Sequence, residues 1–410
     1  MPTQEEILEN LDAVVVPGVM RSLVKMNLVK DVSITDGKVD VSLASAALAE
    51  ESQEWLKDRI KDTTSKLAGV KEVNVSFVDD KPKDLNKIGH VIAVMSGKGG
   101  VGKSLVAGLT AITLRRQGYE VGILDADITG PSIPKMFGIS ARPAGSDSGI
   151  LPVSSKSGIE VMSINLLLPS EDDAVIWRGP LIGRAITQFW EEVLWGKLDY
   201  LIVDLPPGTA DAPLTVLQTL PISGIIIVFT PQDLTAMVVR KAVNMARQMG
   251  KPILGVVENM SYLYIPELDK KIEIFGKSRG EEMSRAAGAP LLGQLPIDPQ
   301  LARLCDEGNI EVYDAEIVAS LGKSILGVIE NMSYLYVPEL DKKIEIFGKS
   351  RAEEMSLAAG APLLGQLPID PQLARLCDEG NIEAYDAEII ASLGKSLALA
   401  NSARVSSEKK

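Results

Sequence analysis

The first 80 residues alternate between stretches with the apolar spacing of a helix and stretches with that of a strand. These stretches follow one another as a helix over Glu5–Leu11, strands over Leu28–Ile34 and Val39–Leu43, a helix over Gln53–Leu67 and a strand over Val70–Val78. The run Asp79–Lys87 is charged and contains a proline, which is typical of a linker. We therefore predict a small α+β domain over 1–80 and a linker over 81–87.

From residue 88 onward the pattern becomes an alternation of buried strands and helices. The apolar run Val91–Met95 is followed by a helical stretch over Ser104–Arg116 and by a second strand over Gly118–Leu124. Strands that alternate with helices in this way are typical of a doubly wound, mostly parallel sheet. We therefore predict an α/β domain over 88–324.

The last part of this pattern occurs twice in the chain. Ile253–Ser324 and Ile325–Ser396 are nearly identical and are offset by 72 residues. They differ only at Val257/Ile329, Ile265/Val337, Gly280/Ala352, Arg285/Leu357, Val312/Ala384 and Val318/Ile390. A solenoid would need three or more stacked units, so we interpret 325–396 as a duplicate of 253–324.

A single nucleotide-binding domain has room for one copy. We expect the first copy to be used, because it follows the predicted helix Asp233–Met249 after a connector of three residues. Bringing in the second copy would lengthen this connector about 25-fold, at a cost of ~3 kcal/mol in loop-closure entropy. The second copy would then pack as an appended lobe, swap into a partner or stay loosely ordered, and we expect 397–410 to be a disordered tail.

Composition and charge narrow the class of protein. The chain has 410 residues, of which 46% are hydrophobic and 24% charged, and its net charge is −13. These values are typical of a globular protein, and the acidic charge argues against nucleic acid as a partner. No apolar run approaches the roughly 18–20 residues that span a bilayer, and the acidic N-terminus is unlike a signal peptide. We therefore expect a cytoplasmic protein without a membrane partner.

A glycine-rich turn directly follows the strand Val91–Met95. Its sequence fits G-x-x-x-x-G-K-[ST], the loop whose backbone N–H groups surround the phosphates of a nucleotide. We expect the phosphates of ATP to be bound by the consecutive residues Gly97, Lys98, Gly99, Gly100, Val101, Gly102, Lys103 and Ser104. In this arrangement Lys103 reaches the β- and γ-phosphates, and the Ser104 hydroxyl binds Mg²⁺.

Carboxylates stand at the ends of two later strands. Asp125 and Asp127 follow the strand Gly118–Leu124, and Asp204 ends the apolar run Leu201–Val203. In open parallel sheets the carboxyl ends of the strands face the crevice in which ligands bind. We predict that Asp127 positions the attacking water, that Asp125 helps to orient the magnesium shell, and that Asp204 contacts this shell as a Walker B carboxylate.

Several motifs together resemble a known group of ATPases. Lys98, directly after the first glycine of GKGGVGKS, resembles the extra lysine of the MinD/ParA/ArsA-type deviant Walker A loop. With LDADITGPSIPKMFG, WRGP, WGKLDYLIVDLPPGTAD, FTPQDL and ENMSY, the chain is similar to the Mrp/ApbC family of ATP-binding iron–sulfur carrier proteins. The resemblance covers nearly the whole chain, and 1–80 is similar to the small iron–sulfur-assembly domain often fused ahead of such ATPases.

The resemblance implies a P-loop ATPase that hydrolyses ATP slowly. It implies a nucleotide-dependent homodimer that carries an iron–sulfur cluster to apo-proteins, with Lys98 acting across the dimer. By position it places Asn259 at the adenine and Pro231 near the nucleoside. Lys98, Lys103 and Asp127 are then the candidate catalytic residues.

The sulfur ligands depart from this family pattern. Cluster-carrying members have a C-P-x-C run after the NMSY motif, but Tyr264–Asp269 contains no cysteine, and the T-x-x-C-P loop of the small domain is also missing. Conventional thiolate bridging of a cluster cannot occur at this position. The two cysteines, Cys305 and Cys377, occupy the same place in the two copies. We interpret Cys305 as a structural helix residue and assign no iron–sulfur ligand.

Two other functions stay open at this point. One is a MinD/ParA-like switch whose nucleotide controls dimerisation on a surface. A switch of this kind would use a basic amphipathic helix, and the C-terminal run SLALANSARVSSEKK is a poor one. The other is a nucleotide-binding scaffold that does not carry a cluster.

Overall fold

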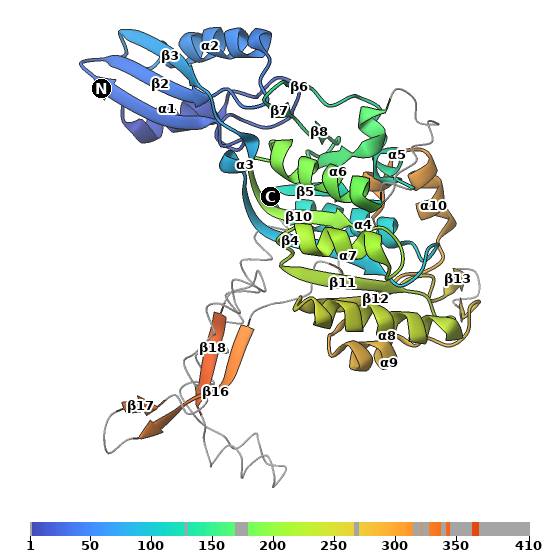
Figure 1. Cartoon of the computed structure of the whole chain (residues 1–410). Coiled ribbons are helices and arrows are strands. Elements are labelled where there is room, and N and C mark those ends of the chain that lie inside the picture. Colours follow the sequence, from blue (N-terminus) through green and yellow to red (C-terminus); the bar gives the residue numbers. More distant parts are fainter. Residues whose placement is uncertain are drawn as a thin grey trace. The chain divides into compact units, whose positions relative to one another are not determined.

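The computed structural model describes residues 2–127, 130–168, 179–265, 270–314, 321, 328–337, 342–344 and 363–368 (Figure 1). The chain divides into two compact units, Met1–Gly322 and Lys323–Lys410. Two predictions concern residues outside the described part of the chain, namely Cys377 and the tail 397–410.

The N-terminal residues of the first unit form a sheet with two helices. In chain order the elements are α1 Gln4–Asp12, β1 Val29–Thr35, β2 Lys38–Ala44, α2 Glu50–Thr64 and β3 Glu72–Val78. Strand β2 pairs antiparallel with β1 and parallel with β3. Helix α1 begins at a capping box in which Thr3 and Glu6 bond to each other's backbone N–H groups. The predicted order of two helices and three strands is confirmed.

The predicted linker is structured. It contains the short helix α3, Pro82–Leu85, and its last residue begins strand β4, Lys87–Ser96. The Asn86 side chain accepts hydrogen bonds from the backbone N–H groups of Trp195 and Gly196, at 2.7 and 3.0 Å, and donates to the carbonyl of Val193. The connection to the second part of the unit is therefore short and hydrogen-bonded, while the domain boundaries stay a prediction.

An eight-stranded sheet organises the rest of the first unit, in the order β15-β12-β11-β4-β10-β5-β9-β8. Besides β4, its strands are β5 Val121–Asp125, β8 Val153–Ser154, β9 Glu160–Ser163, β10 Lys197–Asp204, β11 Gly224–Phe229, β12 Ile253–Glu258 and β15 Leu291–Gln294. All neighbouring strands pair in parallel except β8 and β9. The predicted doubly wound, mostly parallel sheet is confirmed.

Helices cover both faces of this sheet. Alternate residues of β4 face opposite sides, with Val91, Ala93 and Met95 in one apolar cluster and Ile92 and Val94 in the other. The first cluster includes helices α6 Gly179–Glu192, α7 Asp211–Thr219, α8 Asp233–Gln248 and α9 Gly280–Ala287. The second includes α4 Lys103–Arg116, α5 Ile133–Phe137 and α10 Pro299–Asp306. Strand β4 is thus buried on both faces and presents its carboxyl end between the helices.

The second unit repeats the strand pairing of the first copy. Its described strands are β16 Val328–Val337, β17 Lys342–Ile344 and β18 Leu363–Pro368. Val328 lies opposite Leu363 and Glu330 opposite Gln366, the register that β12 and β15 show 72 residues earlier. Likewise β16 pairs with β17 as the hairpin β13 Leu263–Ile265 pairs with β14 Lys270–Ile272. Because the two sequences are nearly identical, the same local pairing forms in both.

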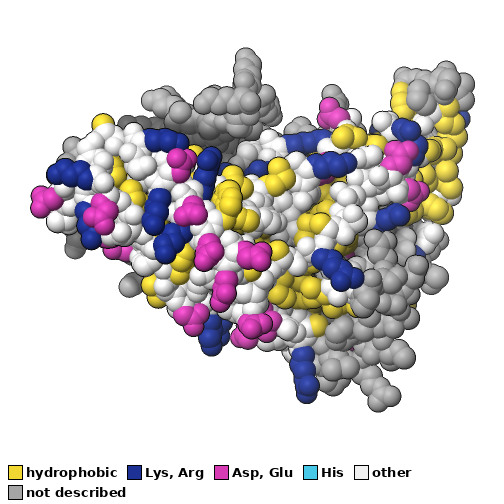
Figure 2. Space-filling view, turned by 90° about the horizontal axis from the view of Figure 1, so that it is seen from above, with side chains coloured by type: hydrophobic (Ala, Val, Ile, Leu, Met, Phe, Trp, Pro, Cys, Tyr) yellow, Lys and Arg dark blue, Asp and Glu magenta, His cyan; other side chains and the backbone are white. Residues whose placement is uncertain are grey.

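The described surface carries charges of both signs. Figure 2 shows acidic and basic side chains interspersed on one face, with hydrophobic side chains between them. Among the described residues, no helix is long and apolar enough to cross a membrane.

Buried charges join the N-terminal sheet to the large sheet. Arg21, 3% exposed, donates to the carbonyl of Trp195 at 2.7 Å and pairs with Glu120 at 3.2 Å. Glu160, fully buried on β9, accepts a hydrogen bond from the single Ser154 hydroxyl, which lies 3.0 and 3.1 Å from its two carboxylate oxygens. Burial raises the pKa of Glu160 to about 7, although the Arg21 charge opposes this shift.

We predict that Glu160 makes the stability of the protein pH-dependent. A folded-state pKa above the ordinary value of 4.5 means that the stabilisation is complete below pH 4.5 and is lost as the pH rises through about 7. Between pH 5 and 8 the wild type should therefore lose about 2 kcal/mol of unfolding free energy relative to Glu160→Gln. Urea unfolding at both pH values measures this difference. A difference that does not change with pH would contradict the account.

Candidate functional site

The glycine-rich loop lies where the prediction placed it, between the carboxyl end of β4 and the start of α4. Gly100 and Gly102 have φ angles of 76° and 79°, a left-handed conformation that glycine adopts at little cost. At Gly102 a side chain is also excluded by space, since a Cβ there would lie 2.2 Å from Nδ2 of Asn259. The loop therefore turns sharply and presents the N-terminus of α4, the end of a helix that binds anions.

Lys103 is the first residue of α4 and is almost fully buried. Its Nζ lies 2.5 Å from Oδ1 of Asp204 and 3.6 Å from Oδ2 of Asp127, and 3.4 Å from the Ser104 hydroxyl. Asp204 ends β10 and Asp127 follows β5, the two strands next to β4 on one side of the sheet. The structure thus brings Lys103, Ser104, Asp127 and Asp204 together at one edge.

Asp125 is in the same region but its carboxylate is engaged by the surrounding loop. Oδ1 accepts from the backbone N–H of Asp127 at 3.2 Å, and Oδ2 accepts from the N–H of Ile133 and the hydroxyl of Ser163. Burial and the Asp204 charge raise its pKa to about 8, while Lys103 opposes the shift. These contacts give Asp125 a part in shaping the loop after β5, and the predicted contact with a magnesium shell stays a prediction.

Two buried polar oxygens next to the loop make no hydrogen bond within the described residues. They are Oδ2 of Asp204 and the hydroxyl oxygen of Thr230, at the ends of β10 and β11, which flank β4. A buried oxygen of this kind normally has a partner, so both are suited to a ligand or its water. Carboxylate and hydroxyl oxygens are also what Mg²⁺ prefers, and Asp204 and Ser104 therefore fit the predicted magnesium site.

The described residues contain no cluster of three or more His, Cys, Asp or Glu side chains that could hold a metal ion. Mg²⁺ commonly uses one or two protein oxygens together with phosphate oxygens and water. The oxygens of Asp204 and Ser104, which lie next to Lys103, could serve as the protein ligands of such a site.

Lys98 is held within its own chain. Its Nζ donates to Oε1 of Gln232 at 2.6 Å, and its carbonyl accepts from the hydroxyl of Ser96. Gln232 directly follows Pro231, which is buried after β11. The predicted role of Lys98 across a dimer stays a prediction, as does the predicted contact of Pro231 with the nucleoside.

Asn259 forms a hydrogen bond with the backbone of the glycine-rich loop. It is 1% exposed, and its Nδ2 donates to the carbonyl of Val101 at 2.9 Å. Its own backbone N–H donates to the carbonyl of Phe229. The contact predicted for Asn259 with the adenine stays a prediction, and the structure adds a role in fixing the glycine-rich loop.

Glu258 is a site residue that the sequence reasoning missed. It is fully buried at the end of β12 and accepts hydrogen bonds from the hydroxyls of Ser261 and Ser278, the N–H of Arg279 and Nε2 of Gln294. These bonds hold the turn that contains Asn259. The charged residue at the end of the apolar run ILGVVE was the available signal.

No thiolate site is found among the described residues. Tyr264 and Ile265 lie in β13, and 266–269 fall outside the described residues. Cys305 is half-buried on α10, where burial and the neighbouring Asp306 raise the pKa of its thiol to about 11. The thiol is therefore protonated at neutral pH, which agrees with a structural role for Cys305.

Sequence comparisons identify relatives for most of the chain. The ParA family model, described as the NUBPL iron-transfer P-loop NTPase, matches residues 87–320 and again 313–399. A model described as iron–sulfur cluster assembly protein matches residues 4–77. The matches cover most of the chain.

Individual relatives agree with these matches. The iron–sulfur cluster carrier protein of Synechocystis is 37% identical over 348 residues, which are 80% of this chain and 98% of that protein. Its counterpart in Clostridium perfringens is 48% identical over 237 residues, 56% of this chain and 83% of that protein. A solved nucleotide-binding protein in complex with ADP from Archaeoglobus fulgidus is 47% identical, with a TM-score of 0.51, over 56% of this chain and 90% of that chain.

We predict that Gly102→Ala destabilises the fold more than Gly118→Ala, a change at the other end of α4. Both glycines have a left-handed φ, which costs alanine roughly 1–2 kcal/mol. Only Gly102 also lacks space, because Asn259 would have to leave its bond to Val101. We expect an additional loss of about 1–3 kcal/mol at Gly102. Urea unfolding of both variants measures this, and equal losses would contradict the prediction.

Proposed function

The chain belongs to the family of NUBPL iron-transfer P-loop NTPases, and on this premise we propose that it binds and hydrolyses ATP and acts in the assembly or transfer of iron–sulfur clusters to apo-proteins. We further propose that it works in the cytoplasm as a nucleotide-dependent homodimer. The observation that supports the nucleotide part most strongly is the buried Lys103 ammonium between Asp204 and Asp127, directly after the glycine-rich loop.

The proposed binding mode follows from the partners of Lys103. Its ammonium group is 5% exposed and now balances the charge of Asp204. When the phosphates of ATP reach the loop, Lys103 turns toward their negative charge. The backbone N–H groups of Gly97–Gly102 then surround the phosphates. Mg²⁺, bound by the Ser104 hydroxyl and through water by Asp204, would neutralise phosphate charge during transfer.

The proposed hydrolysis uses Asp127. Its side chain is 11% exposed, in contrast to the fully buried Asp125, and is close enough to Lys103 to face the bound phosphates. A carboxylate in this place can accept a hydrogen bond from the attacking water and orient it. Asp125, held by Ile133 and Ser163, keeps the loop that carries Asp127 in position.

The proposed dimer would change the partner of Lys98. In the single chain its ammonium group is bound to Gln232, so we propose that it leaves this amide to reach the nucleotide of the second subunit. Gln232 and the nucleotide of the second subunit then compete for the Lys98 ammonium group. Because the γ-phosphate adds negative charge to that nucleotide, dimerisation would depend on ATP.

The protein could act on the iron–sulfur cluster in two ways. In the first, the protein carries the cluster through cysteines. In the second, it supplies nucleotide-driven assistance while another protein holds the cluster. The second version is favoured by the absence of cysteine from Tyr264–Asp269 and by the raised thiol pKa of Cys305.

Anaerobic reconstitution with iron and sulfide tests this proposal. Bound iron is measured for the wild type and for Cys305→Ser with Cys377→Ser, and transfer to an apo-ferredoxin is followed with and without Mg-ATP. Iron that binds and is lost in the double variant supports carriage. Iron-free protein that still accelerates cluster insertion by a donor, only with ATP, supports assistance. Protein that binds no iron and has no ATP-dependent effect on cluster insertion would contradict both versions.

We predict that Gln232→Ala strengthens ATP-dependent dimerisation. Removing a hydrogen bond to a charged group frees Lys98 and should lower the dimer dissociation constant by roughly tenfold. Light scattering in the presence of ATP measures this, with Gln248→Ala on the exposed end of α8 as the control. Weaker or unchanged dimerisation in Gln232→Ala would show that this contact does not compete with the dimer.

A further inference from the structure

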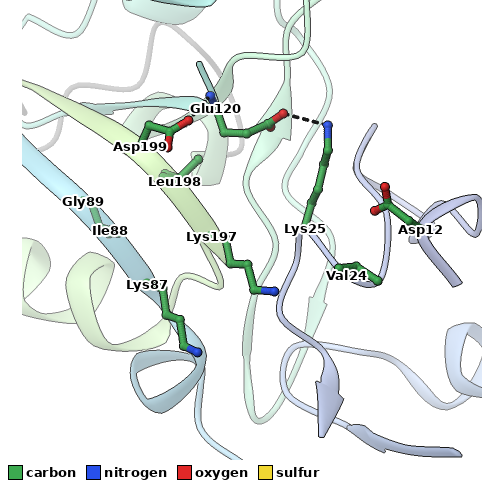
Figure 3. Close-up of a pocket in the computed structure, with 10 residues that line it drawn as sticks. All are labelled: Asp12, Val24, Lys25, Lys87, Ile88, Gly89, Glu120, Lys197, Leu198 and Asp199. Carbon is green, nitrogen blue, oxygen red and sulfur yellow. Dashed lines mark hydrogen bonds and ion pairs between the residues drawn. The ribbon is translucent and has the colours of Figure 1, made fainter. Parts of the chain in front are cut away.

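A cleft of about 610 Å³ opens at the end of the large sheet that is opposite to the glycine-rich loop. It lies between the first residues of β4 and β10 and the segment before β1, and Figure 3 shows the side chains that line it. Val24, Ile88 and Leu198 supply apolar walls. Its volume is in the range of sites for small organic ligands, about 300–1,000 Å³.

Two lysines stand next to each other in this cleft. Lys87 and Lys197 are in register on the parallel strands β4 and β10, and Figure 3 shows them extending from these neighbouring strands. Strands in a sheet are roughly 4.8 Å apart, so like charges in this arrangement repel each other. The ammonium groups of these two lysines form no ion pair or hydrogen bond with any residue that the structure describes.

The carboxylates of the cleft are already engaged elsewhere. Glu120 is shared by Arg21, Lys25 and Arg115, at 3.2, 2.8 and 3.3 Å. Asp199 accepts the backbone N–H of Glu120 at 2.8 Å, and Asp12 accepts the hydroxyl of Ser22. Three cations thus share the charge of one carboxylate. The lining carries three lysines and three carboxylates, and Arg21 and Arg115, which also pair with Glu120, add two further cations next to the cleft.

From this arrangement we propose that the cleft is a second ligand site, which binds a small organic polyanion with carboxylate or phosphate groups. Lys87 and Lys197 bind its negative groups from the large sheet, and Lys25 approaches from the N-terminal part. The apolar walls contact its carbon skeleton. The ligand removes the repulsion between the two strand lysines and joins the two parts of the first unit.

This site is separate from the proposed nucleotide site. Strands β4 and β10 have Lys87 and Lys197 at one end and Ser96 and Asp204 at the other. A strand of ten residues spans about 30 Å, so one small molecule cannot occupy both sites. The inference does not depend on ATP hydrolysis or on cluster transfer.

Calorimetric titration of the full chain with citrate and with inorganic pyrophosphate tests the proposal. Magnesium is omitted so that neither probe is chelated, and each titration is repeated on Lys103→Met, so that binding at the glycine-rich loop is recognised by its loss. At about 0.15 M salt we expect one equivalent of at least one probe to bind with a dissociation constant below about 1 mM. The probe that binds more tightly shows whether carboxylate or phosphate is preferred.

Two double variants separate a built site from a general effect of charge. Lys87→Gln with Lys197→Gln should weaken binding roughly tenfold or more, since it removes charge-assisted hydrogen bonds. Lys57→Gln with Lys71→Gln removes the same charge from exposed positions outside the cleft and should leave binding unchanged. Circular dichroism verifies the fold of both. Equal weakening in the two variants, or no binding of either probe to the wild type, would overturn the proposal.

Discussion

The buried contact between Lys103 and Asp204 is the interaction on which the site depends. A lysine that is 5% exposed needs a negative partner, because removing an ammonium group from water is costly. Asp204 supplies this charge from the carboxyl end of β10, and Asp127 adds a second one from the end of β5. The same arrangement leaves Oδ2 of Asp204 without a partner among the described residues. The negative charge of Asp204 therefore holds the Lys103 ammonium group in place, and the phosphates of a nucleotide can take over this role.

The sheet explains why these groups meet. Neighbouring strands β5, β10, β4 and β11 run in parallel, so their carboxyl ends bring Asp125, Asp204, the glycine-rich loop and Thr230 to one edge of the sheet.

Much of this arrangement could be predicted from the sequence, because the glycine-rich loop and the acidic residues after apolar strands are local patterns. The partners of each side chain could not be predicted in the same way. The contact of Lys98 with Gln232 joins residues 134 positions apart, and that of Asn259 with Val101 joins residues 158 positions apart. Such contacts depend on register and loop shape, which composition and spacing do not specify. For the same reason Glu258 was missed, and the binding of Asp125 to its own loop was not foreseen.

The duplication and the missing cysteines determine how far the family function extends to this chain. Strands β16 and β18 keep the register of β12 and β15, which shows that the repeated sequence determines this pairing locally. The strands β12 and β15 of the large sheet come from the first copy. Neither copy contains the paired cysteines that would hold a cluster in the usual way. The nucleotide part of the proposed function therefore has a more complete set of residues than the cluster part.

The most direct test of the central claim is calorimetric binding of ADP, without magnesium, to the wild type, Asp204→Asn and Lys103→Met. If phosphates replace Asp204 as the partner of Lys103, then Asp204→Asn removes the competitor, and ADP should bind roughly tenfold more tightly than to the wild type. Lys103→Met should lose most of the affinity, and Lys57→Met, at an exposed position in α2, should behave as the wild type. Weaker binding to Asp204→Asn than to the wild type would contradict the claim that this ion pair marks the place of the phosphates.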